Sequence, residues 1–211
     1  MAFRGLLGYA LFCVGGATTA FVGGRYVVGE WQQQDARRAW DEAEARAVVA
    51  LARRTATRDA RAAVPIETGA PVARLLIPRI SLDEIVLEGV DDNTLNAGPG
   101  HLPGSAFPGE RGNAVISSHR DRHFARLDEV RVGDTLVTES GAHRARWVVV
   151  SKRVIDADAP AIFRTGEPTL TLTTCWPIRF LGTAPERLLI SAKPISAPRP
   201  LTPSFANANA K

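Results

Sequence analysis

One cysteine follows a strand-like segment, where a nucleophile would be accessible. Residues 169–174 read Thr-Leu-Thr-Leu-Thr-Thr, an alternation of period two that is typical of a half-buried β-strand. Cys175 comes next, and Pro177 stops the strand just beyond it. An unpaired cysteine is more often a small buried hydrophobic residue. Its place at the end of a strand nevertheless predicts that the thiol emerges at the edge of a sheet.

A histidine follows a second predicted strand, over residues 113–118. His119 lies there among polar residues, which is a poor position for a core side chain. A cysteine nucleophile needs a base, or a thiolate–imidazolium pair, within hydrogen-bonding reach. An imidazole can afterwards protonate a leaving amine. His123 is the rival candidate, whereas His101 and His143 fall in predicted loops and are expected at the surface.

Acyl transfer also needs donors or positive charge where the carbonyl oxygen becomes negative. Losing one such donor typically costs about 3 kcal/mol of transition-state stabilisation. Arg187 begins the predicted strand that follows Cys175, so the connecting loop can return its guanidinium to the sulfur. Arg179 is closer in sequence but lies within that loop, and Asp121 either orients a histidine or pairs with a neighbouring arginine. These residue types predict acyl transfer with Cys175 as nucleophile, His119 as acid and base, and Arg187 as the oxyanion-stabilising cation.

Metal and phosphate chemistry find little support in the motifs. The four histidines and Cys175 form no CxxC or paired-histidine pattern of the kind that holds a metal ion. The glycines of Gly98-Pro99-Gly100 lack the lysine and the spacing of a phosphate-binding loop. We therefore predict no cofactor and no metal site.

The distribution of charge argues against nucleic acid as a partner. The 211 residues include 26 Lys and Arg against 22 Asp and Glu, a formal net charge of +4. Residues 1–63 hold 9 basic and 6 acidic side chains, which leaves 17 against 16 in the rest of the chain. A nucleic-acid-binding domain would concentrate basic side chains on one face. The length suits one domain with an anchor or tail.

The N-terminal part is predicted to be an anchor, residues 1–29, and a helical stalk with linker, residues 30–71. Residues 5–24 carry no charge, and 20 helical positions span about 30 Å, the thickness of the bilayer's hydrocarbon core. A cleaved signal peptide is the alternative, although Thr18-Thr19-Ala20 is a poor cleavage site. The stalk is rich in Ala, Arg and Glu, which favours a solvated polar helix.

Residues 72–195 are predicted to form an all-β catalytic domain with short helices. Short apolar segments recur between closely spaced turn signals, which indicates a barrel or a sandwich. The predicted strands are 72–77, 85–90, 113–118, 135–139, 146–155, 169–174 and 187–192. Short helices are expected over 123–130 and 156–163. The Pro-, Asn- and Ala-rich tail, residues 196–211, is predicted to be disordered.

In its order of motifs the chain resembles the sortases. Thr171-Leu172-Thr173-Thr174-Cys175 is similar to the family's TLxTC motif, Ser118-His119-Arg120-Asp121 to its HRD segment, Ala184-Pro185-Glu186-Arg187 to the APxRF-type sequence of class D-like members, and Gly98-Pro99-Gly100-His101 with Pro108-Gly109 and Gly112-Asn113 to its GPGH…PG…GN stretch. The resemblance covers residues 72–193. Ser118, Arg122 and Trp176 depart from common family residues, which affects subclass and substrate preference rather than the chemistry.

The resemblance implies a closed eight-stranded β-barrel with a groove for an LPxTG-like sorting signal on a substrate protein. Cys175 would attack the threonine carbonyl of the signal, Arg187 would stabilise the oxyanion, and His119 would protonate the departing glycine amine. An amine of an envelope component or of another protein would then resolve the thioester. Some sortases use calcium, but no acidic cluster in this sequence indicates it.

The composition and the single predicted span, residues 5–24, look most like the sortases of Gram-negative proteobacteria. The expected location is the inner membrane, with the catalytic domain on the periplasmic side. Two alternative functions stand beside the sortase interpretation. An L,D-transpeptidase would place its cysteine in a Gly-rich His/Ser context, unlike Thr-Thr-Cys-Trp-Pro. A membrane-tethered envelope-binding module without catalysis is the other, against which the intact His119, Cys175 and Arg187 argue.

Overall fold

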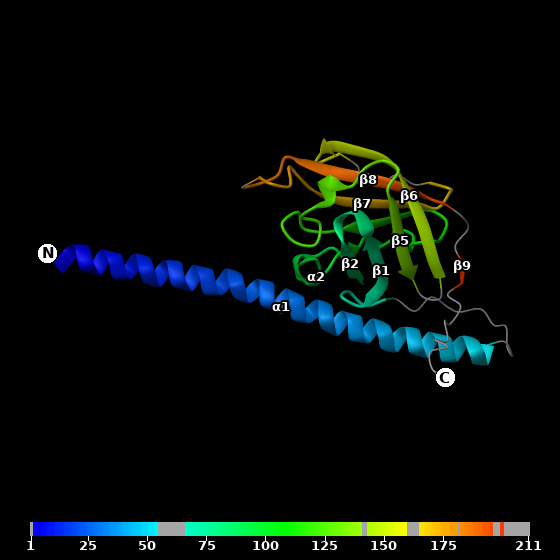
Figure 1. Cartoon of the computed structure of the whole chain (residues 1–211), viewed down its shortest axis with the longest axis horizontal. Helices are drawn as coiled ribbons and strands as arrows, with labels where there is room; N and C mark the ends of the chain where they lie inside the picture. Colours follow the sequence, from blue (N-terminus) through cyan, green and yellow to red (C-terminus); the bar gives the residue numbers. More distant parts are fainter. Residues whose placement is uncertain are drawn as a thin grey trace, which may run out of the picture.

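The computed structural model describes residues 2–54, 66–140, 143–159, 165–180, 182–195 and 199–200. One long helix, α1 (Ala2–Arg54), runs along the side of a strand-rich domain, and its N-terminal part projects beyond it (Figure 1). The strands are β1 (Pro71–Ile77), β2 (Leu82–Glu88), β3 (Gly100–His101), β4 (Asn113–Ser117), β5 (Thr135–Ser140), β6 (His143–Asp156), β7 (Thr169–Trp176), β8 (Glu186–Pro194) and β9 (Arg199–Pro200). Three short helices connect them, η1 (Pro78–Ile80), α2 (Asp92–Ala97) and η2 (Leu127–Glu129).

The sheet closes on itself. Its strand order is β5-β1-β2-β3-β4-β7-β8-β6-β9, and an additional pairing between β5 and β6 joins the two sides. Strands β1 to β8 therefore form a closed barrel, and β9 adds to β6 outside that closure. Closure removes the open edges that an all-β sheet would otherwise expose. The predicted closed eight-stranded barrel is confirmed.

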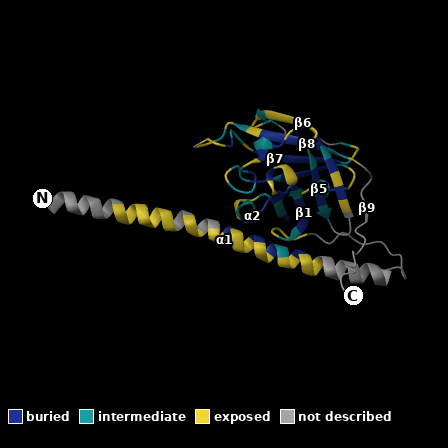
Figure 2. Ribbon diagram, viewed as in Figure 1, coloured by how far each residue is buried: buried dark blue, intermediate teal, exposed yellow. Residues whose placement is uncertain are grey.

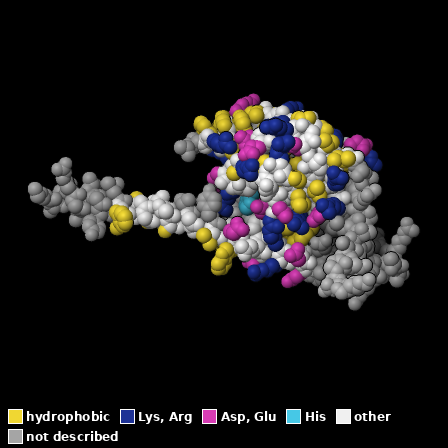
Figure 3. All heavy atoms as spheres, viewed as in Figure 1, with side chains coloured by type: hydrophobic (Ala, Val, Ile, Leu, Met, Phe, Trp, Pro, Cys, Tyr) yellow, Lys and Arg dark blue, Asp and Glu magenta, His cyan; other side chains and the backbone are white. Residues whose placement is uncertain are grey.

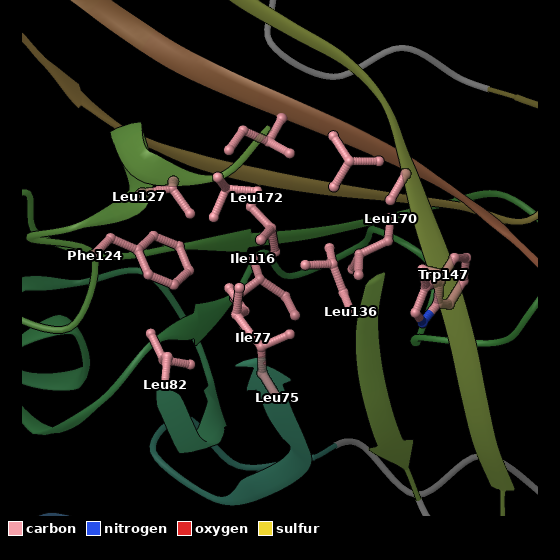
Figure 4. Close-up of a cluster of buried hydrophobic side chains, with 14 of the residues drawn as sticks. Leu75, Ile77, Leu82, Ile116, Phe124, Leu127, Leu136, Trp147, Leu170 and Leu172 are labelled. Carbon is pink, nitrogen blue, oxygen red and sulfur yellow. The ribbon is translucent and has the colours of Figure 1, made fainter. Parts of the chain in front are cut away.

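Alternating apolar residues from all sides of the barrel fill its interior. In Figure 4, Leu170 and Leu172 of β7 point toward Ile116, Leu136 and the ring of Trp147. Each large side chain that is fully buried contributes about 1.5–3 kcal/mol relative to an exposed one. The one polar atom of the Trp147 ring is also satisfied, because Nε1 donates to Thr138 Oγ1 at 2.8 Å. This core holds the strands that carry the candidate chemistry.

Strand β7 is buried on both faces, which corrects the expectation of a half-buried strand. All residues from Thr169 to Thr174 are buried. Burial of the threonine face is possible because hydroxyls on that face find partners. Thr171 Oγ1 donates to Asn113 Oδ1 at 2.8 Å, and Thr169 Oγ1 donates to the Glu167 carbonyl at 3.2 Å. On the opposite face, Thr174 Oγ1 donates to the Ser118 carbonyl at 2.7 Å. The alternation indicates the strand correctly, but it does not show which face meets solvent, because the methyl group and bonded hydroxyl of threonine also suit the interior.

Helix α1 runs without a break from the predicted anchor into the first part of the predicted stalk, as far as Arg54, and residues 55–65 of the stalk and linker lie outside the described residues. Among the helices of the described residues, none combines the length and the hydropathy that crossing a bilayer requires, so the predicted membrane span is not supported. Residues 5–24 are uncharged, but many are Gly, Ala or Thr, which contribute little hydropathy.

The prediction of a fully solvated stalk is wrong for the middle of α1. Its residues 12–20 are exposed, but the stretch that passes the barrel buries Gln33, Ala36 and Trp40 (Figure 2). Ala36 and Trp40 form a small hydrophobic cluster with Ile85, Leu87 and Ala97. The polar composition of this segment concealed a narrow stripe that packs against the domain.

Several small elements differ from the expectation. Residues 123–130 hold turns and η2 rather than a helix, and in 156–163 the described part is the end of β6 and a turn, while 160–163 lie outside the described residues. Helix α2 and strand β3 were not predicted. In the tail, residues 199–200 pair with β6 as β9, and the other tail residues, 196–198 and 201–211, lie outside the described part.

Candidate active site

Strand β7 presents Cys175 at its C-terminal end. The residues before it are buried, whereas Cys175 is exposed, as the sequence predicts for a thiol at the end of the strand. The strand stops after Trp176, and the Trp176–Pro177 peptide bond is cis. The sulfur is therefore accessible to a substrate while its backbone remains part of the sheet.

Arg187 lies directly opposite Cys175. The two residues are Cα partners in the antiparallel β7–β8 ladder, and Arg187 is exposed. Side chains of directly opposed residues share one face of a sheet, with Cβ atoms about 5 Å apart. The backbone of Arg187 also pairs with Ile155 of β6, so β8 is held from both sides at this point. The register therefore places the Arg187 side chain on the same face of the sheet as the thiol, without reliance on a loop.

His119 comes to the same end of the barrel because β4 runs parallel to β7. The register pairs Ser117 with Thr173. Just beyond it, the Ser118 amide donates to the Thr173 carbonyl at 3.2 Å, and Thr174 Oγ1 donates to the Ser118 carbonyl. The residue before His119 is thus bonded to the two residues before Cys175. The side chain of His119 is partly exposed, at 31%.

Arg120 connects the His119 turn to the loop between β7 and β8. Its Nη1 donates to the Pro177 carbonyl at 2.9 Å, its Nη2 donates to the Gly182 carbonyl, and its guanidinium lies 5.9 Å from the centre of the Phe180 ring. From the sequence, the one interaction expected of Arg120 is a pairing with Asp121. Its place in the HRD segment was the available signal of a further role, which the structure shows to be the anchoring of the loop that follows Cys175.

Helix α2 supplies a carboxylate next to the histidine. Asp92 Oδ1 lies 4.0 Å from His119 Nε2, and the Asp92 side chain is 93% exposed. Asp91 caps this helix, accepting from the amides of Asn93 and Thr94. The Thr94 hydroxyl and amide hold the pKa of Asp91 below its usual value. No helix was predicted here, because six residues are too few to show a helical periodicity.

The rival candidate His123 faces a different strand. Its Nδ1 lies 3.6 Å from Glu84 Oε1 on β2, and its side chain is only 13% exposed. Together these residues line a cavity of about 340 Å³ that Glu30 of α1 and Asp121 also border. The lining includes no residue of β7 or β8, so this histidine is not presented to Cys175.

His101 was expected at the surface, and this is wrong. It lies in β3 with 1% of its side chain exposed, Nδ1 is 2.7 Å from Glu88 Oε2, and its ring stacks on Phe107. A loop-like GPGH sequence concealed a short, buried strand. His143 begins β6 rather than lying in a loop, and its side chain is outside the described part of the structure.

The remaining sequence candidates lie at the periphery. Arg179 is exposed on the β7–β8 loop, and its charge acts on Glu129, whose pKa is held below its usual value mainly by a hydrogen bond from Arg126. Asp121 is exposed on the rim of the cavity beside His123. Within the described ranges, no group of three or more His, Cys, Asp or Glu side chains is placed to hold a metal ion.

Two buried hydroxyls next to the candidate site make no hydrogen bond among the described residues. Thr173 Oγ1 and Ser118 Oγ are both buried in residues that are 4% and 3% exposed. Buried polar groups without partners are uncommon and occur at functional sites. Thr173 stands two residues before Cys175, so the two side chains share one face of β7.

Comparison with known proteins identifies relatives of this arrangement. A family model described as the Sortase domain matches residues 75–195. Sortase D of Bacillus subtilis (strain 168) is 34% identical over 132 residues, which are 62% of this chain and 67% of that protein.

Two solved structures match as well. The catalytic domain of B. anthracis SrtD is 31% identical, with a TM-score of 0.53 over 66% of this chain and 97% of that one. A Clostridium perfringens Sortase D5 transpeptidase has a TM-score of 0.62 over 81% of this chain and 99% of its own, and at 22% identity it supports the fold alone. Since the family match spans more than half of the sequence and agrees with the closed barrel, the chain belongs to the sortase family of cysteine transpeptidases.

Proposed function

We propose that this sortase cleaves an LPxTG-like sorting signal and transfers the acyl part to an amine through a thioester on Cys175. The observation that carries the proposal is the direct pairing of Cys175 with Arg187 across β7 and β8, at the exposed end of the barrel. Acyl transfer needs a nucleophile and a fixed cation at the same carbonyl. A sheet register supplies that pair with little freedom to drift.

In the acylation step, the Cys175 thiolate attacks the threonine carbonyl carbon of the signal. The carbonyl oxygen takes the electron pair of the former double bond, and the Arg187 guanidinium stabilises this negative charge with hydrogen bonds. When the tetrahedral intermediate collapses, the bond to the glycine nitrogen breaks. The acyl group then remains on sulfur as a thioester.

His119 handles the proton in both halves of the reaction. It protonates the departing glycine amine during acylation and accepts a proton from the incoming amine when the thioester is resolved. Its turn is bonded to β7 through Ser118 and to the β7–β8 loop through Arg120. The same connections are expected to keep the acid–base group near the nucleophile in both steps.

The acceptor amine is expected on an envelope component or another protein, because sorting signals attach proteins to such groups. The extracytoplasmic location and the Gram-negative source stay predictions from the sequence. Basic and acidic side chains alternate on the visible face of the domain rather than gathering by sign (Figure 3). That face therefore shows no extended basic patch of the kind that binds a nucleic acid.

The test is a transpeptidation assay with the purified full-length protein, an LPxTG peptide, sequence variants of that peptide, and glycine amide as acceptor. The full chain is required because α1 contributes Trp40 and Gln33 to buried contacts with the domain. Mass spectrometry should show the ligated product. Cys175→Ala should abolish it, whereas the matched control Cys13→Ala, which removes the exposed cysteine of α1, should not.

Two outcomes would contradict the proposal. One is product formation by Cys175→Ala at the wild-type rate. The other is a folded wild type that gives no product with any signal peptide and whose Cys175 does not react with a small electrophile. The second result would favour the non-catalytic envelope-binding module instead.

A further inference from the structure

Helix α1 places one buried polar side chain against the barrel. Gln33 is 3% exposed, although its neighbours Gln32 and Gln34 are exposed. Its Nε2 donates to the carbonyls of Ile85 and Ala97 at 3.0 and 3.1 Å, and its Oε1 accepts from the Ile85 amide at 3.1 Å. The amide of one side chain therefore satisfies three backbone groups from two different elements.

The position of Ile85 explains why these bonds matter. On the side away from β1, strand β2 pairs with β3 only at Leu87 and Glu88. On that side the amide and the carbonyl of Ile85 have no strand partner. The side-chain amide of Gln33 bonds to both of them instead. A buried donor or acceptor left unsatisfied is strongly unfavourable. The same amide also holds Ala97, the last residue of α2, at the seam between helix and barrel.

Two glycines show how closely the parts approach. A Cβ at Gly98 would lie 2.3 Å from Gln33 Nε2, and a Cβ at Gly29 of α1 would lie 2.5 Å from Arg122 Nη1 and 2.8 Å from the Asn96 carbonyl. All three distances are too short for a real Cβ atom. Helix α1, helix α2 and the turn that follows His119 therefore meet at Gly29 without spare room.

On its other side, α2 contacts the His119 turn. Arg122 Nη1 donates to the Asn96 carbonyl at 2.6 Å, and Asp92 Oδ1 lies 4.0 Å from His119 Nε2. Because Asp92 is 93% exposed, its attraction to the imidazole is weak, and the bond from Arg122 is the firmer connection. Any shift of α2 is therefore passed to the turn that carries His119.

We propose that Gln33 is a positioning residue for catalysis, which fixes α2 and thereby the orientation of the His119 turn. The N-terminal helix is then a working part of the catalytic domain and more than a tether. This inference rests on the proposed role of His119. It predicts that substitution of Gln33 slows the chemical steps while leaving binding of the signal peptide nearly unchanged, because the hydrogen bonds of Gln33 reach β2 and α2 rather than the strands that carry Cys175 and Arg187.

The test compares Gln33→Ala with Gln34→Ala in the full-length protein. Misplacing a catalytic group by about 1 Å can reduce the rate on the order of 100-fold, so a partial displacement should lower kcat about tenfold. The KM for the signal peptide should change less than about twofold, because uniform binding is retained. Gln34→Ala removes an exposed side chain of the same type and should match the wild type.

A second pair of variants leaves the Gln33 side chain in place. Gly29→Ala places a methyl group against Arg122 and Asn96, whereas a Cβ at Gly24 meets nothing within 4 Å. Gly29→Ala should lower kcat in the same direction as Gln33→Ala, and Gly24→Ala should not. This pair keeps the proposal testable even if Gln33→Ala fails to fold.

Failure of the positioning role can be distinguished from failure of the proposed function. If the wild type forms the ligated product, and both Gln33→Ala and Gly29→Ala lower the melting temperature but keep the wild-type kcat, Gln33 has a structural role only and the positioning role is overturned. A loss confined to KM would also overturn it. If the wild type forms no product at all, the proposed function fails first, and the positioning role fails with it.

Discussion

The end of the barrel that carries Cys175 and the contact between α1 and β2 are held together in different ways. At the barrel end, β7 pairs with β4 from Thr169 to Thr173 and with β8 from Leu170 to Trp176, and its apolar face lies in the main core. At the α1 contact, five buried side chains and one glutamine amide join a helix to the edge of a strand. The first region is specified redundantly and the second by very few groups.

The two regions therefore differ in what fixes the positions of the site residues. Cys175 and Arg187 obtain their relation from sheet register, which a single surface substitution does not change. His119 stands beyond the end of β4, so its direction depends on the turn, on α2 and on α1. The Cys175–Arg187 pair and the His119 side chain should therefore respond differently to mutation.

The largest expected effect is a loss of stability, and its size should differ between the barrel core and the α1 contact. Leu172→Ala removes a fully buried core side chain and should lower the free energy of unfolding by about 2–5 kcal/mol. Trp40→Ala should lower the global value less, because undocking of α1 limits the penalty to the local contact. Chemical denaturation gives the first quantity, and hydrogen exchange along α1 shows the second. Equal global losses would mean that helix and barrel form one cooperative unit.

Arg187→Lys should reduce turnover about 10²–10³-fold without a measurable change in stability. A single ammonium cannot reproduce the donor geometry of the guanidinium at the developing oxyanion, and Arg187 is exposed in the free protein. Steady-state kinetics and a melting curve measure the two quantities. Near-wild-type turnover would remove Arg187 from the proposed mechanism.

Arg120→Ala should lower kcat/KM about tenfold, which corresponds to roughly 1.4 kcal/mol. The variant releases the Pro177 and Gly182 carbonyls, so the loop after Cys175 loses its connection to the His119 turn. Arg179→Ala, on the same loop but directed elsewhere, serves as the matched control. Equal activity of the two variants would show that the connection is not needed.

Asp91→Ala should destabilise the α2 region by about 1 kcal/mol, because it removes the cap of that helix. Asp91→Asn keeps an acceptor for the amides of Asn93 and Thr94 and should retain most of the stability. Hydrogen exchange of these two amides reports the change. If both variants exchange alike, the cap does not hold α2.

The smallest expected effect is a loss of stability at low pH. Asp83 on β2 accepts from Arg74 and pairs with Arg37 of α1, and the bond from Arg74 is the main reason that its pKa lies below the usual value. A lowered pKa gives stability that is present above the unfolded value, about 3.9, and is lost as the pH falls through the folded value. Because the pair is partly exposed, the loss should stay below about 1 kcal/mol. Asp83→Asn should flatten this part of the pH profile, and an unchanged profile would contradict the assignment.

The sequence was most informative where a period and a stop signal coincide. The alternation before Cys175, with Pro177 behind it, located the strand end, and the strand that begins near Arg187 brought the guanidinium back to it. The buried positions of Gln33 and His101 were not predictable in the same way. Three successive glutamines look alike until a helix meets a strand edge, and a two-residue strand such as β3 has no period. Helix α2 was missed for the same reason, since its six residues are too few to show a helical period and the helix depends on the Asp91 cap.

The most direct test of the account is to identify which residue becomes acylated. The full-length protein is mixed with an LPxTG peptide, quenched in acid before an acceptor is added, digested, and mapped by mass spectrometry. Cys13 on α1 and Cys175 on β7 are both exposed, so each is available for modification. The account predicts the acyl group on the peptide that contains Cys175 and none on Cys13. An acyl group on Cys13, or on any residue other than Cys175, would contradict it.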